Sequence, residues 1–293
     1  MAKQLIILAI TTAVILSTGP TVLGAAANEK QEEREQPIQE LFQTDLVYPQ
    51  EKGEVQLTLS PRFHRAGKSK SLIFPLRIEY GITDAWQVEL GWEIFKHRNP
   101  DEGSTTSGIG DLEIGTKYGF MNIADSNFHA AAGFDILFPT GNINRGLTEG
   151  FIEYEPSLIL AKDFPELHNL QLFTQVGIGF VQRVKRPADP EDKEPAAHEL
   201  TVNAGFFLPF DFPFGKFIFT SEFNWTTNKW NNDGKEDQKY YTPGLVWNLP
   251  GGWEIGIGTA IGLNRDADDY RIIGMLTFEF DTQKRQVRQV TRR

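Results

Sequence analysis

The sequence predicts an all-β protein, a membrane-spanning antiparallel up-and-down β-barrel of about twelve strands. Three observations predict it. Apolar residues recur with a period of two along most of the chain after Gly53, the connections between these runs alternate between short and long, and aromatic residues gather near the ends of the runs. Alternating faces, sorted loops and aromatic bands are together typical of a barrel in an outer membrane.

Composition limits the class of protein. The chain has 293 residues, including 22 Phe and 27 Gly, and a formal net charge of −10. Aromatic residues are enriched in strands, and a net negative charge argues against nucleic acid as a partner. There is no Cys, which excludes disulfides, thiolate catalysis, Cys-based metal sites and acylation of an N-terminal cysteine.

Residues 1–27 have the order of a secretory signal peptide. Lys3 precedes a short apolar run from Leu5 to Leu16, and small residues follow at 24–27. The apolar run is shorter than the roughly 20 residues that a membrane-spanning helix needs. We therefore expect cleavage near Ala26 or Ala27 and export of the mature protein.

Residues 28–52 form a polar, charge-rich N-terminal leader. Two interpretations are open: a solvated, disordered segment, which we favour, or a short helix after Pro37 with Ile38, Leu41 and Phe42 on one side. The pattern does not decide whether the leader or a long loop enters the barrel.

The clearest run extends from Gly108 to Phe120 (GIGDLEIGTKYGF). Read with period two, one face is apolar and ends in aromatic residues, while the other carries Asp111, Glu113 and Lys117. We expect the apolar face to contact lipid and the charged face to line a water-filled interior. The run is about as long as a tilted strand that crosses a bilayer.

The same alternation extends over residues 53–280, the predicted barrel, and a basic tail at 281–293 should lie in the periplasm. The predicted inward charges are Arg77, Glu79, Glu89, Glu93, Asp111, Glu113, Lys117, Asp135, Glu153, Glu155, Glu222, Arg271 and Glu279. Two interpretations of this acidic interior are open. It could form a net-negative pore that prefers cations or neutral solutes, or ion pairs that fill a narrow barrel.

Connections at 81–85, 122–127, 211–215 and 248–252 are short, while those at 96–107, 140–149, 183–199 and 227–238 are long. Short periplasmic turns and long extracellular loops are typical of a transmembrane barrel. Aromatic rings at the strand ends suit the lipid headgroup level. The predicted aromatic girdle comprises Tyr80, Trp86, Phe120, Trp225, Trp247, Trp253 and Phe280. Pro75, Pro156 and Pro209 fall inside predicted strands and should mark bulges or strand ends.

Four motifs in this order resemble one family. They are Tyr80-Gly81-Ile82-Thr83-Asp84 with Trp86 and Glu89, then Gly108-Ile109-Gly110-Asp111-Leu112 leading to Lys117-Tyr118, then Phe138-Pro139-Thr140-Gly141, and finally Pro243-Gly244-Leu245. The chain resembles the outer-membrane transporter-like family associated with the meta-pathway of phenol degradation. That resemblance implies a β-barrel and the uptake of aromatic compounds. The chain departs from it in its tail after Phe280.

No catalytic residue, metal or cofactor is predicted. A Ser–His pair oriented by a third group would support lipid hydrolysis, but no serine is placed near His129, the histidine on the predicted inward face. Asp266, Asp268 and Asp269 could bind Ca²⁺ through their oxygens, although we favour a solvated acidic loop.

The sequence therefore predicts a monomeric, non-enzymatic barrel of the outer membrane of a Gram-negative-type bacterium. Its expected partners are outer-membrane lipid and a small solute that passes passively, with aromatic or hydrophobic compounds as the candidates. The alternatives are a non-conducting structural barrel and, less favoured, an outer-membrane lipid-modifying enzyme.

Overall fold

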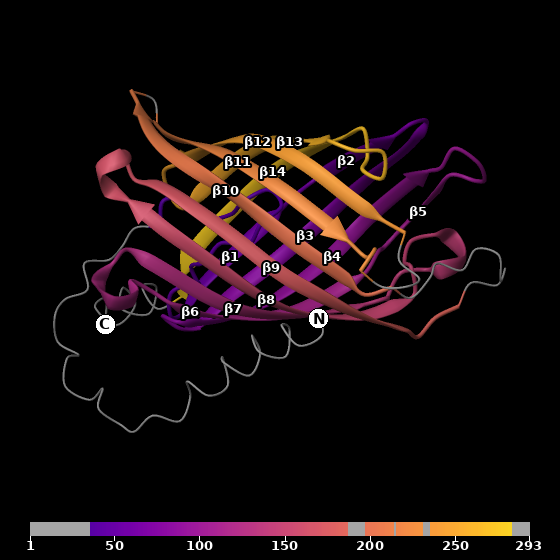
Figure 1. Cartoon of the computed structure of the whole chain (residues 1–293), viewed down its shortest axis with the longest axis horizontal. Coiled ribbons are helices and arrows are strands. Elements are labelled where there is room, and N and C mark those ends of the chain that lie inside the picture. The colour runs from indigo at the N-terminus through magenta and orange to yellow at the C-terminus, as the bar shows by residue number, and fades with distance from the viewer. Residues whose placement is uncertain (1–35, 187–196, 214, 231–234, 283–293) are drawn as a thin grey trace, which may run out of the picture. The chain divides into compact units, whose positions relative to one another are not determined.

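The computed structural model describes residues 36–186, 197–213, 215–230 and 235–282. The expected signal peptide and almost all of the expected basic tail lie outside the described residues. The described chain forms one antiparallel sheet whose steeply tilted strands close on themselves (Figure 1). Among the described residues, no helix is both long enough and apolar enough to cross a membrane.

Fourteen strand segments build the sheet. They are β1 (Glu54–Leu59), β2 (Arg62–Ala66), β3 (Ser69–Thr83), β4 (Trp86–Asn99), β5 (Thr106–Gly108), β6 (Leu112–Phe120), β7 (Phe128–Phe138), β8 (Phe151–Phe164), β9 (Leu170–Arg183), β10 (Glu199–Phe212), β11 (Gly215–Thr227), β12 (Asp237–Leu249), β13 (Trp253–Gly262) and β14 (Tyr270–Asp281). Three short 3₁₀ turns, η1 (Ile123–Asp125), η2 (Ile143–Arg145) and η3 (Pro165–Leu167), lie in the connections.

Two strand positions are each made of two segments. β1 and β2 both pair with β3 and with β14, and β5 and β6 both pair with β4, so the fourteen segments occupy twelve positions. Because the first position pairs with β14 on its other side, the sheet has no open edge. The prediction of an antiparallel barrel of about twelve strands is confirmed. Closure satisfies the backbone groups that an edge in lipid would leave unpaired.

The run from Gly108 to Phe120 was expected to be one strand, and this is wrong at its start. β5 ends at Gly108 and β6 begins only at Leu112. In between, the Gly110 N–H donates to the Glu93 carbonyl (2.9 Å) and the Glu93 N–H donates to the Asp111 carbonyl (3.0 Å). A Cβ at position 110 would overlap the Glu93 side chain. The chain therefore stays attached to β4 while it leaves the regular pleat.

The expectation that prolines mark bulges or strand ends is confirmed at Pro75, where the register of β3 and β4 shifts between Phe74 and Pro75. Pro156 and Pro209 instead lie inside β8 and β10. The ladder of β8 and β9 leaves out Pro156, and the ladder of β9 and β10 ends at Phe207, before Pro209. Each proline sits where its missing N–H removes no ladder bond on that side.

The outer face of the barrel is apolar. Ile114, Tyr118 and Phe120, which were expected to contact lipid, are 47%, 48% and 52% exposed. The other large exposed apolar residues of the strands include Ile78, Leu90, Trp92, Phe134, Leu158, Leu172, Val176, Phe223, Leu245, Ile255, Ile257, Ile261, Ile272 and Leu276. A continuous apolar surface of this kind is unfavourable in water and suits a bilayer.

Most connections sort by length, as expected. The connections at 84–85, 121–127, 165–169, 213–214 and 250–252 lie at one end of the barrel, called here the short-turn end, and those at 100–105, 139–150, 184–198, 228–236 and 263–269 lie at the other, the long-loop end. Two connections are exceptions: the turn at 67–68 is tight although it lies at the long-loop end, and the connection at 121–127 is longer than the one at 100–105.

Candidate functional site: the lumen and the segment inside it

Residues 36–50, which make up most of the described part of the leader, lie inside the barrel and are called here the lumen segment. Ile38, Phe42 and Val47 are 0%, 2% and 1% exposed. The interpretation of the leader as solvated is therefore wrong for these residues, and no helix forms in them. Their apolar side chains pack against inward-facing apolar residues of the wall, namely Ala131, Ile159, Ala161, Phe173, Phe207, Ile218, Tyr240, Val246, Ala260, Ile273 and Met275.

The lumen segment enters and leaves at the short-turn end. Near its start, the Asn248 side chain donates to the Pro37 carbonyl (3.2 Å), and β12 ends one residue later. Near its end, the Gln50 N–H donates to the Gln87 side chain (2.9 Å), close to the start of β4. The segment reaches deepest around residues 42–45, so its path is a loop with both ends on the same side.

Two buried wall carboxylates accept hydrogen bonds from this irregular backbone. The Glu222 carboxylate accepts from the Phe42 N–H (2.9 Å), the Gln43 N–H (3.1 Å) and the Thr44 hydroxyl (2.7 Å). The Glu254 carboxylate accepts from the Gln39 N–H (3.0 Å). These bonds replace the partners that a strand or helix would otherwise give to buried N–H groups.

The Phe42 ring lies in a cradle of three glycines on β12 and β13. A Cβ at Gly244 would overlap the ring, and one at Gly256 or Gly258 would lie only 3.1 Å or 2.8 Å from it. Because glycine has no side chain, the ring can approach the wall backbone closely. This fit fixes Phe42 at one place in the lumen.

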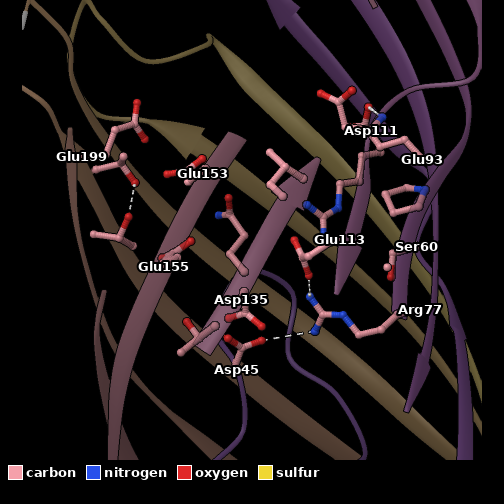
Figure 2. A pocket seen from close by; sticks show the side chains of 18 of the residues that line it. Asp45, Ser60, Arg77, Glu93, Asp111, Glu113, Asp135, Glu153, Glu155 and Glu199 are labelled. Atoms are coloured by element: carbon pink, nitrogen blue, oxygen red, sulfur yellow. Dashed lines mark hydrogen bonds and ion pairs between the residues drawn. The ribbon is translucent and has the colours of Figure 1, made fainter. Parts of the chain in front are cut away.

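Basic wall residues hold the other side of the segment. Arg77 on β3 places Nη1 3.2 Å from Asp45 Oδ1 and 3.7 Å from Glu40 Oε2, and Nη2 lies 3.9 Å from Glu113 Oε1 (Figure 2). Lys117 on β6 donates to the Leu46 carbonyl (2.9 Å). Inside the barrel, both residues therefore bind the lumen segment.

A cavity of about 940 Å³ lies beyond the segment, toward the long-loop end, with residues 40–45 among its lining (Figure 2). Its acidic lining residues are Glu40, Asp45, Glu89, Glu93, Asp111, Glu113, Asp135, Glu149, Glu153, Glu155, Glu199 and Glu236, and its basic lining residues are Arg62, Arg77, Lys96 and Lys235. The cavity is therefore strongly acidic.

The charges are distributed unevenly around this cavity. Arg77 and Lys96 form ion pairs on the side of β3, β4 and β6, with a Lys96–Glu93 distance of 3.0 Å. The opposite wall carries acids on β8 and β10, here called the acidic wall: Glu153, Glu155 and Glu199. Within the described ranges, these three acids form no ion pair. A cation in the cavity would meet carboxyl oxygens there that no basic side chain of the described residues pairs.

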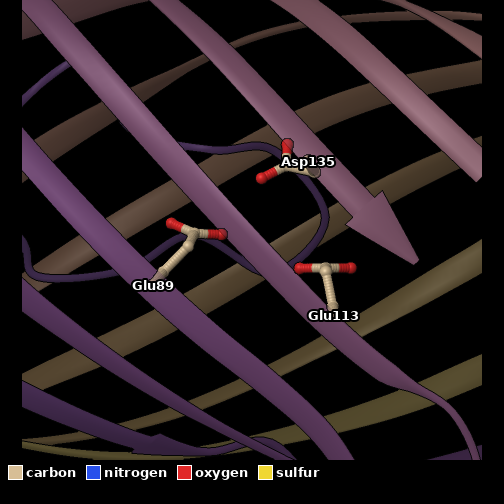
Figure 3. A group of neighbouring side chains, drawn as sticks. All are labelled: Glu89, Glu113 and Asp135. Carbon is tan, nitrogen blue, oxygen red and sulfur yellow. The ribbon is translucent and has the colours of Figure 1, made fainter. Parts of the chain in front are cut away.

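Glu89, Glu113 and Asp135 come from the neighbouring strands β4, β6 and β7 and converge between the two sides of the cavity (Figure 3). One carboxylate oxygen of each lies within 4.8 Å of the others. Gly115 lies between Glu89 and Asp135 in the ladder, and a Cβ there would overlap the Asp135 carboxylate. Oxygen ligands at this spacing could hold a cation.

The structure places the thirteen predicted inward charges in three regions. Lining the cavity are Arg77, Glu89, Glu93, Asp111, Glu113, Asp135, Glu153 and Glu155. Glu79, Lys117, Glu222 and Glu279 do not line the cavity: Lys117 and Glu222 bind the lumen segment, and Glu79 accepts from Gln56 and Gln87 at 2.7 Å each. Arg271 lies at the long-loop end and donates to Asp268 (2.7 Å).

Sequence reasoning missed several residues of the lumen. Glu40 and Asp45 were assigned to the leader, Glu199 was assigned to a loop, and Glu254 was passed over. One available signal was the presence of Ile38, Leu41 and Phe42 in an otherwise polar segment. A second was the alternation of Glu254 with Trp253 and Ile255, which places it on the inner face.

The predicted girdle residues lie at strand ends. Tyr80, Trp86, Phe120 and Trp253 are 42%, 41%, 52% and 41% exposed, while Trp225, Trp247 and Phe280 are half-buried. Near the short-turn end, Trp86 donates its indole N–H to Thr116 (2.7 Å). At the long-loop end, Trp225 donates to Asp237 (2.6 Å). Amphipathic rings with such polar partners suit the headgroup level.

His129 has a structural role. Its Nδ1 accepts from the Asn122 N–H (3.0 Å), and its Nε2 lies 2.9 Å from Asp163 Oδ2. Both ring nitrogens are therefore occupied, and neither is directed at a serine nucleophile as a hydrolase requires. Asp163 also lies 3.3 Å from the hydroxyl of Tyr48, so this network helps to hold the lumen segment.

The three aspartates once considered for Ca²⁺ bind different partners. Asp266 pairs with Lys229 (2.6 Å), and Asp269 accepts from the Gly67 N–H (2.9 Å). Asp268 contacts Arg271 (2.7 Å) and His64 (3.3 Å). Burial alone would raise the pKa of Asp268, but the hydrogen bond from His64 and the charge of Arg271 hold that pKa below its usual value.

No protein-family model matches this chain, and no curated protein matches its sequence. Solved structures do match in fold. The NanC porin aligns over 76% of this chain and 98% of its own chain, with 10% identity and a TM-score of 0.52. The β domain of the Bordetella autotransporter BrkA aligns over 79% of this chain and 100% of its own, with 12% identity and a TM-score of 0.51. The KdgM porin gives 11% identity and a TM-score of 0.49.

These values define a class of fold. A closed barrel with an apolar exterior and a polar lumen is the architecture of outer-membrane β-barrels, and this chain shares that architecture with porins. At such low identity, the likeness shows the fold alone.

Proposed function

We propose that this protein is a monomeric channel of a bacterial outer membrane that lets small solutes pass passively. The observation that carries the proposal is the acidic cavity of about 940 Å³ inside a closed barrel with an apolar exterior. The expected export signal and the fold shared with porins support this location.

The charge of the cavity gives the channel a preference. Acidic residues outnumber basic ones in the lining, and the acidic wall has no basic partner within the described residues. Fixed charge of one sign attracts ions of the other sign and repels those of its own. The channel should therefore favour cationic and neutral solutes over anionic ones.

Flux into liposomes tests this proposal. The folded protein should admit a small alkylammonium ion several times faster than an alkyl carboxylate of equal size. A variant with Glu153→Gln, Glu155→Gln and Glu199→Gln should bring the two rates closer together, because it removes the negative charges of the acidic wall. Faster passage of the carboxylate through the unmodified protein would contradict the preference.

The resemblance to the phenol-pathway family supports a narrower proposal, that the solutes are aromatic. Phe42, Leu137 and Phe151 add apolar surface to the cavity lining. In the same liposomes, a water-soluble aromatic solute should then pass faster than an aliphatic solute of equal size and charge. Equal rates would remove the aromatic preference and leave the channel proposal in place.

One observation favours the alternative of a non-conducting structural barrel. The lumen segment occupies the short-turn half of the interior, and its Phe42 is buried against the wall. If the segment never moves, correctly folded protein should show no solute flux above that of empty liposomes.

A further inference from the structure

The lumen segment closes one half of the barrel. Residues 40–45 line the cavity, and the apolar side chains of the segment pack against the wall on the short-turn side. A solute that enters from the long-loop end therefore meets Glu40 and Asp45 before it can go further. Passage through the barrel requires this segment to move.

The way the segment is attached allows such movement. Among the described residues, 36–50 belong to no strand and take no part in the backbone ladders. The barrel closes between β1 and β14 from Glu54 onward, beyond the segment. Removing the segment from the lumen would therefore break no strand pairing, and the membrane-facing sheet would keep its backbone hydrogen bonds.

In addition to the bonds with Lys117, Glu254 and Asp163, three groups of contacts hold the segment in place. Glu222 accepts three hydrogen bonds from residues 42–44. The ring of Phe42 fills the glycine cradle, and Arg77 binds Asp45 and Glu40. All three groups act around the deepest part of the loop, so loosening them would free the part that blocks the path.

We propose that residues 36–50 are a displaceable plug and that their release from Glu222, Arg77 and the glycine cradle opens the channel. This inference rests on the proposed channel function. The two conformations differ by the contacts named above, and any change that weakens those contacts shifts the population toward the open form.

Single-channel recording with cysteine variants tests the proposal. The chain has no native Cys, so a Thr44→Cys/Asn224→Cys pair introduces the only thiols. The Thr44 hydroxyl and the Asn224 amide nitrogen are 3.5 Å apart, so oxidation can tie the plug to β11. We expect the oxidised pair to stay closed and a reductant to restore openings at least as frequent as those of the unmodified protein, because the reduced pair lacks the Thr44 hydroxyl bond to Glu222.

Shortening the Phe42 side chain tests whether a weakened plug favours the open form. Phe42→Ala empties the glycine cradle and should raise the open probability several-fold. The matched control is Phe223→Ala, an equal truncation on the lipid-facing side of β11, where the ring is 41% exposed. The control should leave the open probability unchanged. Migration on a gel with and without heating verifies that each variant has folded.

Labelling measures the movement of the plug independently of conduction. Val47 is 1% exposed, so a Val47→Cys thiol should react slowly with a membrane-impermeant maleimide. Adding Phe42→Ala should accelerate the reaction at least tenfold. If the oxidised pair and Phe42→Ala both conduct like the unmodified protein and labelling stays slow, the plug proposal is wrong while the channel stands. If labelling accelerates and no variant conducts, the plug moves but the channel function is wrong.

Discussion

At the scale of single residues, the lumen contains buried charged groups that would destabilise the fold if they had no hydrogen-bond partners. A buried carboxylate without partners carries a large desolvation penalty. Glu222 is fully buried, yet it receives three hydrogen bonds from the lumen segment. The segment and this carboxylate therefore stabilise each other, and each would lose partners if the other were changed.

The glycine cradle gives a prediction at the same scale. Gly258→Ala should destabilise the closed form, because the new Cβ would lie 2.8 Å from the Phe42 ring and such overpacking typically costs about 1–3 kcal/mol. In the Phe42→Ala background the same substitution should lower the free energy of unfolding only slightly, because no ring remains for the new Cβ to contact. Thermal unfolding of the four proteins of this double-mutant cycle measures the coupling. Equal costs in both backgrounds would show that the two residues do not interact.

At the scale of elements, the long-loop end is held by a charged network. Asp268 on the β13–β14 connection joins His64 on β2 and Arg271 on β14, and its amide N–H donates to the Tyr240 hydroxyl (2.7 Å). The network ties this connection to three strands. Its strength should depend on the charge of Asp268.

A pH dependence follows from the lowered pKa of Asp268. The folded protein favours the ionised carboxylate of Asp268. Its contacts with Arg271 and His64 are therefore fully formed above pH 3.8, the ordinary pKa of Asp, and they weaken as the pH falls through the lower pKa of the folded state. Hydrogen exchange at the Asp268 amide, corrected for intrinsic rates, should lose protection only below that range. Asp268→Asn should show no such acid step. A loss of protection that begins near neutral pH would contradict the assignment to Asp268.

The elements also show what can be predicted from sequence. Period-two alternation is local information, and it assigned Glu113, Lys117 and Tyr118 to the faces that they occupy. The break before Leu112 was missed because the alternation continues through Asp111 while the backbone leaves the pleat. The position of residues 36–50 was missed for another reason. Their partner Glu222 lies some 180 positions away, and no local period reports a contact of that range.

At the scale of the whole molecule, a membrane-spanning barrel requires that the apolar exterior face lipid. Ile257 in the middle of β13 is 60% exposed, and Leu167 in a connection is 50% exposed. In a membrane-spanning barrel, Ile257→Arg should cost about 2–4 kcal/mol at the bilayer midplane, whereas Leu167→Arg should cost much less near an interface. Unfolding in lipid vesicles compares the two variants. Similar small costs would indicate that the exterior faces water.

We propose above all that the lumen is a cation-favouring path through this barrel. The reversal potential of the purified protein in a planar bilayer with a KCl gradient tests this directly. We expect a reversal potential whose sign indicates cation preference, and a shift of that potential toward zero when Glu153, Glu155 and Glu199 are all replaced by Gln. A reversal potential whose sign indicates anion preference, or no conductance even in Phe42→Ala, would contradict the proposed path.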